Sequence, residues 1–81
     1  GAPMPALDHL LKEFVVDVRQ AENQLVLKTT PGSAQPVAAG LDSSGWEELI
    51  GTIAGDDTIL IITENKGIAK KVATRIQEII Q

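Results

Sequence analysis

The sequence contains no cysteine, one histidine and very few aromatic residues, and these shortages exclude several kinds of site. Without cysteine, disulfide bonds and thiolate metal sites are ruled out. The single histidine, His9, has no serine or cysteine partner in a recognisable catalytic arrangement, so we expect it to be solvated or packed. No Gly-Lys-Ser/Thr phosphate loop follows Gly51 or Gly55. We therefore expect that the chain is not an enzyme.

Basic residues are also scarce. Seven Lys and Arg stand against 11 Asp and Glu in 81 residues, which gives a formal net charge of -4. Nucleic-acid-binding domains normally carry a basic patch, so direct binding of DNA or RNA by this chain is not expected. An acidic protein attracts a cationic ligand or partner more readily.

Long apolar runs and a signal peptide are absent as well. No apolar stretch approaches the roughly 20 residues that cross a bilayer. The start of the chain lacks the basic end and apolar centre of a signal peptide, so we expect a soluble, cytoplasmic protein without membrane contacts. Gly1 and Ala2 precede an internal Met4, as in a cloning remnant or cut linker. Residues 1–6 are therefore expected to be a tail, and residues 7–81 one domain excised from a longer chain.

Short apolar segments and two helical patterns predict the fold. Strands are expected at 14–19, 24–30, 50–54 and 58–63, and helices at 34–42 and 68–80, after a short helical turn at 7–12. In the first strand, Val16 and Val18 should point to one face and Asp17 to the other. The predicted fold class is α+β, a two-layer ββαββα sandwich in which two helices cover one face of a four-stranded antiparallel sheet.

Both expected helices carry a capping residue and an apolar stripe. Ser33 and Asn65 precede them and can accept hydrogen bonds from their first turns. Gln35 and Asp42 are seven residues apart, so both face the same side of the first helix, at the edge of its stripe. That stripe consists of Ala34, Val37, Ala38 and Leu41. Trp46, just after this helix, is expected to pack its ring against the core.

The sheet has more apolar residues than two helices can cover. The segments 25–27 and 59–62 are apolar at successive positions, so they place aliphatic groups on both faces of the sheet. The helices cover one face, and the other requires another chain. Because small chains commonly gain stability by self-association, we predict a homo-oligomer.

Two adjacent carboxylates, Asp56 and Asp57, separate the last two expected strands. A polar hairpin turn is one interpretation, because Gly and Asp are ordinary turn residues. A divalent-metal site is another, since Gly-Asp-Asp hairpins hold magnesium in RNA-copying polymerases, although this chain lacks the further acids and basic residues that such enzymes need. A third is a cation site at an oligomer interface, where one carboxylate serves its own subunit and the other a neighbour.

A guanidinium ligand suits the third interpretation. Its five donors form a planar fork that pairs with carboxylates from more than one direction. Gln35 and Asp42 add an amide and a third acid, which can hold other polar groups of the same ligand. An amino acid with a guanidinium side chain would fit this set.

Two separated motifs resemble those of a known family. Residues Gly51–Thr58 read GTIAGDDT and, with the aliphatic residues 59–62 after them, are similar to the C-terminal signature of the bacterial arginine repressors. Residues Thr30–Gln35, TPGSAQ, resemble the Pro-Gly-x-Ala-Gln segment of that family, and Asp42 follows Gln35 at the expected step. The resemblance runs from about residue 11 to residue 80. Thr63, where many relatives have cysteine or another residue, departs from the family pattern, and it lies away from the implied site.

The resemblance implies trimers that stack in pairs into a hexamer, with L-arginine bound between them as corepressor and no other cofactor. It implies a ligand-binding site formed by Gln35, Asp42, Thr52, Ala54, Asp56 and Asp57. Asp42 and Asp57 would act within one subunit, and Asp56 across the trimer interface. Operator DNA would be bound by a separate N-terminal domain, in control of arginine biosynthesis or catabolism genes. A purely structural oligomerisation module without a ligand remains an alternative.

Overall fold

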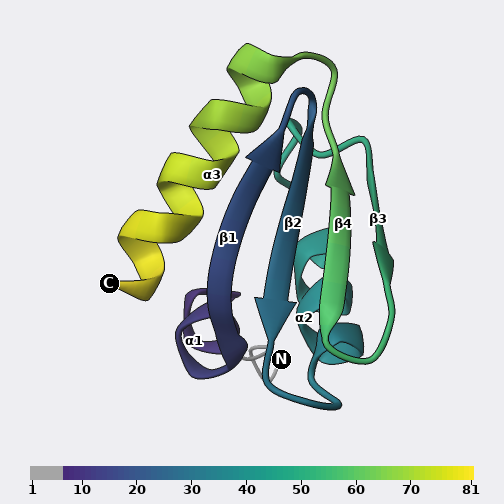
Figure 1. Ribbon diagram of the computed structural model, residues 1–81, viewed down its shortest axis with the longest axis vertical. Coiled ribbons are helices and arrows are strands. Elements are labelled where there is room, and N and C mark those ends of the chain that lie inside the picture. Colours follow the sequence, from purple (N-terminus) through teal and green to yellow (C-terminus); the bar gives the residue numbers. More distant parts are fainter. Residues whose placement is uncertain (1–6) are drawn as a thin grey trace.

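A computed structural model describes residues 7–81, and the elements follow the order αββαββα (Figure 1). They are α1 (Leu7–Phe14), β1 (Val15–Ala21), β2 (Gln24–Thr29), α2 (Ala34–Ser43), β3 (Gly51–Ala54), β4 (Thr58–Ile62) and α3 (Lys66–Ile80). The predicted α+β class with a four-stranded antiparallel sheet is confirmed. The short helical turn expected near the start is a helix of eight residues, so residues 7–81 contain three helices instead of two. The tail predicted at residues 1–6 lies outside the described residues.

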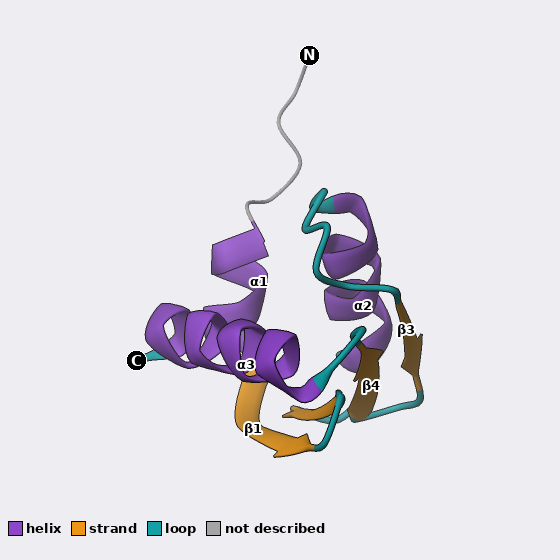
Figure 2. Cartoon of the chain, turned by 90° about the horizontal axis from the view of Figure 1, so that it is seen from above, coloured by secondary structure: helices purple, strands orange, loops and turns teal. Residues whose placement is uncertain are grey.

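The sheet has the strand order β1-β2-β4-β3, and all neighbouring strands are antiparallel. The three helices lie on the same side of it, which leaves the other face open (Figure 2). One row of paired residues crosses the whole open face: Arg19, Val26, Leu60 and Ile53. Within residues 7–81, none of the helices combines the length and apolar character of a membrane span.

Strand β1 contains a β-bulge. Val15 pairs with Thr29 and Asp17 with Lys28, so Val16 is an extra residue without a partner. Val18 is buried beneath the helices, whereas Val16 is 64% exposed. The prediction that Val16 and Val18 share a face was wrong, because the strict alternation of a strand fails at the extra residue.

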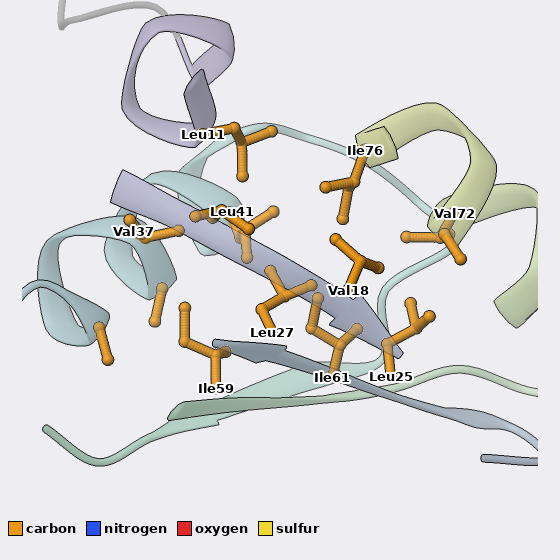
Figure 3. Close-up of a cluster of buried hydrophobic side chains, with 14 of the residues drawn as sticks. Leu11, Val18, Leu25, Leu27, Val37, Leu41, Ile59, Ile61, Val72 and Ile76 are labelled. Carbon is orange, nitrogen blue, oxygen red and sulfur yellow. The ribbon is translucent and has the colours of Figure 1, made fainter. Parts of the chain in front are cut away.

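The core lies between the sheet and the three helices (Figure 3). Leu27, Ile59 and Ile61 project from the two central strands and are fully buried. The helices meet them with aliphatic side chains that are also buried: Leu11, Val37, Leu41, Val72 and Ile76. The stripe predicted on α2 is confirmed, since all four of its residues are buried. The core therefore fixes the orientation of α2, and with it the side on which Gln35 and Asp42 stand.

The two expected helix caps have different outcomes. The Asn65 side chain accepts a hydrogen bond of 2.8 Å from the backbone N–H of Ile68, as predicted for the start of α3. Ser33 precedes α2 but makes no side-chain cap; its backbone is already helical, and its hydroxyl pairs with that of Thr30 at 2.9 Å. The capping prediction for Ser33 was therefore wrong, because Thr30 takes its hydroxyl.

Replacing Asn65 with alanine is expected to lower the free energy of unfolding by about 1 kcal/mol, because the N–H of Ile68 loses its acceptor. Asn65→Asp keeps an acceptor oxygen and should retain most of the stability. Urea denaturation of both variants, with an unchanged denaturant slope, measures the effect. Equal stability of Asn65→Ala and the parent chain would show that the cap contributes nothing.

Candidate functional site

Helix α2 lies beside strand β3 (Figure 2), and four of the six predicted site residues meet in pairs along this contact. The Gln35 amide nitrogen donates a hydrogen bond of 2.9 Å to the backbone carbonyl of Ala54. The Thr52 hydroxyl donates one of 2.8 Å to the carboxylate of Asp42. Gln35 and Asp42 are two helical turns apart, about 10 Å along the axis. Asp42 contacts the second residue of β3 and Gln35 the last, so the helix spacing predicted from the sequence produces an elongated polar flank.

The two carboxylates of the β3–β4 turn face different neighbours. Asp56 accepts a hydrogen bond of 3.2 Å from the backbone N–H of Gly32, in the connection between β2 and α2. Asp57 accepts one of 2.9 Å from the Thr58 hydroxyl and lies 3.9 Å from the ammonium nitrogen of Lys28. The turn thus presents one acid beside the start of α2 and the other at the edge of the open sheet face.

Backbone hydrogen bonds hold this turn against its neighbours. The carbonyl of Asp57 accepts from the N–H of Thr29 at 2.8 Å, and that of Asp56 accepts from the N–H of Ala34 at 3.2 Å. Gly32 has a φ of +78°, a conformation that glycine adopts without strain, and this lets the chain turn so that its N–H reaches Asp56. The position of the two carboxylates is therefore fixed by the end of β2 and the first turn of α2.

Lys28 lies beside the candidate site and was not among the predicted residues. Its ammonium group donates a hydrogen bond of 2.7 Å to the Thr58 hydroxyl, besides lying near Asp57. The Lys28 and Asp57 side chains are 46% and 51% exposed, so water screens the pair, which contributes at most about 1 kcal/mol. Asp57 therefore remains able to accept hydrogen bonds from a further cation.

The geometry of the turn bears on the metal interpretation. Across the part of the chain that the structure describes, no group of three or more potential metal-ligating side chains comes together. The carboxylates of Asp56 and Asp57 are engaged by separate donors on separate sides. Two splayed carboxylates suit a ligand with several N–H groups better than a single ion, since a planar fork of donors reaches acceptors in several directions.

Comparison with known proteins agrees with the motif resemblance. Residues 11–78 match the family described as arginine repressor, C-terminal domain. The arginine repressor of Koribacter versatilis is 51% identical over 80 residues, which cover 99% of this chain and 54% of that protein. That of Acidobacterium capsulatum is 49% identical over 77 residues, 95% of this chain and 52% of the relative. The arginine repressor of Staphylococcus aureus strain JH9 is 45% identical over 74 residues, which cover 91% of this chain and 49% of that protein.

The chain spans about half the length of these curated relatives. The family match covers α2, the whole sheet, every predicted site residue, the second half of α1 and all but the last two residues of α3. This chain belongs to the arginine repressor family, whose C-terminal domain it matches.

Proposed function

We propose that this chain is the effector-sensing and hexamerisation part of an arginine-responsive transcriptional regulator. L-arginine is its corepressor and binds between two trimers, with no other cofactor and no enzymatic step. Operator DNA is read by an N-terminal domain outside this chain, in the cytoplasm, and the targets are genes of arginine metabolism. The observation that carries the proposal is the line of acceptors along the α2–β3 flank and the adjoining turn, in a chain of this family.

The charges of these side chains complement those of arginine. Asp42, Asp56 and Asp57 are three acids, whereas L-arginine carries a guanidinium and an α-ammonium group. The acids stand at both ends of a flank about 10 Å long, so an extended ligand can reach them with different groups. Gln35 and Thr52 supply an amide and a hydroxyl between them, and the backbone of Ala54 an additional acceptor. The site therefore favours an elongated ligand with two cationic groups.

The open sheet face supports self-association. Four aliphatic residues form a patch on it, which we call the open-face patch: Val26, Ile53, Leu60 and Ile62. Ile53 is 70% exposed, and the other three are partly exposed. Burying such a patch against another copy of the chain removes apolar surface from water. Both faces of the sheet would then be covered, as the apolar segments 25–27 and 59–62 predict.

Ligand binding and assembly are coupled in this proposal. Lys28 and Thr58 lie on the same sheet face as the open-face patch, and Asp57 contacts both of them. A neighbouring chain on the patch would therefore stand beside Asp57. A ligand that binds only the assembled form stabilises that form by mass action, and assembly raises ligand affinity in return. Arginine thus fixes how the tethered DNA-binding domains are spaced.

Calorimetric titration with L-arginine, L-lysine and L-citrulline tests the ligand assignment. Arginine should bind with saturation at millimolar concentration or below. Lysine lacks the planar fork and citrulline lacks the charge, so each should bind at least about tenfold more weakly, a difference of 1.4 kcal/mol. Binding of Mg²⁺ without arginine would support the metal site instead. A chain that assembles yet binds none of these would be a purely structural module.

A further inference from the structure

A cation–π contact links helix α3 to the connection between α2 and β3. The guanidinium carbon of Arg75 lies 3.7 Å from the centre of the Trp46 ring. Trp46 belongs to that connection and is packed partly against the core, as its sequence position predicted. A cation over an aromatic face is attracted by the ring quadrupole. The contact therefore joins the connection to α3, a helix that carries none of the predicted ligand-binding residues.

Hydrogen bonds hold the same connection from within. The Ser44 hydroxyl donates a bond of 2.6 Å to the carbonyl of Leu41 and accepts one of 3.1 Å from the backbone N–H of Trp46. The carbonyl of Trp46 accepts from the N–H of Leu49 at 3.2 Å. Figure 2 shows that the connection runs on the helix side of the sheet. Several hydrogen bonds thus hold the segment around Trp46, and two of them are made by the Trp46 backbone.

This segment separates two of the proposed ligand-binding residues. Asp42 lies in the last turn of α2 and Thr52 near the start of β3, and their side chains meet at 2.8 Å. The distance between them depends on the path of the chain from 44 to 50. The core orients α2, and pairing with β4 orients β3. The Asp42 side chain itself is exposed, so its carboxylate is held by the bond from Thr52 and by the path of the connection.

We propose that Trp46 and Arg75 are positioning residues for the arginine site. The stack between them fixes the α2–β3 connection and so holds Asp42 and Thr52 at the distance that the ligand requires. Neither residue touches the ligand. A pre-formed site loses less conformational entropy on binding, so affinity depends on the stack. The inference rests on the proposed function, because it concerns the same site.

Substitutions of Arg75 separate this role from simple packing. Arg75→Gln should weaken L-arginine binding roughly two- to fivefold, the factor that corresponds to an exposed cation–π contact. Arg75→Lys keeps a cation near the ring and should recover part of the loss. Lys71→Gln, one turn earlier on the exposed side of α3, is the matched control and should bind like the parent chain. Affinities are measured by calorimetry under conditions in which urea titration shows each variant to be fully folded.

A double-mutant cycle gives the decisive result. Trp46→Leu should weaken arginine binding, and adding Arg75→Gln to it should weaken binding no further, because the contact is already lost. If the stack only stabilises the fold, the variants should be less stable to urea, but the folded variants should bind arginine as tightly as the parent chain. That outcome, with the parent chain binding arginine, overturns this inference alone. If the parent chain does not bind arginine, the proposed function is overturned together with the inference.

Discussion

Asp57→Asn is expected to weaken L-arginine binding by about 10- to 100-fold, or 1.4–2.8 kcal/mol. Asparagine has the size of aspartate and retains one acceptor oxygen, but it lacks the charge that strengthens a hydrogen bond from a guanidinium. In this chain Asp57 is well placed for such a bond, because the Thr58 hydroxyl and the N–H of Thr29 fix it at the edge of the open face. Calorimetry gives the affinity directly.

The same substitution should leave the fold nearly intact. The side chain of Asp57 is 51% exposed and its contact with Lys28 is 3.9 Å long, so its loss should change stability by less than about 1 kcal/mol. Glu78→Gln on the exposed side of α3 removes the same charge away from the site and serves as the control. Unchanged affinity in Asp57→Asn would remove Asp57 from the proposed site.

Leu60→Asp is expected to weaken self-association at least a hundredfold, which should leave a mainly dissociated chain at micromolar concentration. Leu60 stands in the middle of the open-face patch, between Val26 on β2 and Ile53 on β3. A carboxylate there would have to lose its water when a second chain covers the patch, which is costly without a partner. Sedimentation velocity measures the change in mass.

A second variant separates assembly from folding. Leu60 is partly covered within its own chain, so Leu60→Asp can also affect the fold. Ile53 is 70% exposed, and Ile53→Asp should therefore weaken assembly while the single chain keeps its helical content and stability. Gln77→Asp on α3 adds a charge to the opposite side and should assemble normally. If Leu60→Asp and Ile53→Asp both assemble like the parent chain, the open face is not the interface.

The fold was predicted where local patterns decide it. The apolar stripe of α2 follows from helix periodicity alone, and it sets Gln35 and Asp42 on one side before any neighbour is known. The Asn65 cap depends on a residue three positions away, so it too is visible in the sequence. The helices and strands that such local patterns predict begin and end within one or two residues of the predicted bounds.

The remaining features depend on pairing between distant segments. The bulge at Val16 exists because Val15 and Asp17 pair with consecutive residues of β2, a register that no local pattern specifies. Ser33 fails as a cap because its hydroxyl bonds to Thr30 instead. Such contacts are settled by the packed structure, and composition and periodicity do not reveal them.

The same distinction applies to the candidate site. Five of the six residues were predicted from two contiguous motifs, and Asp42 from its spacing to Gln35. Lys28 was missed because it reaches Asp57 only through the antiparallel pairing of β2 with β4, which sets it opposite Thr58. Trp46 was expected in the core, but its contact with Arg75 joins segments whose proximity the sequence does not show.

The most direct test of arginine-coupled assembly is native mass spectrometry of the parent chain with and without L-arginine. We expect millimolar arginine to shift the population to a species of six chains that carries bound arginine, and L-lysine at the same concentration to do so poorly. A chain that stays monomeric in millimolar arginine would contradict the account.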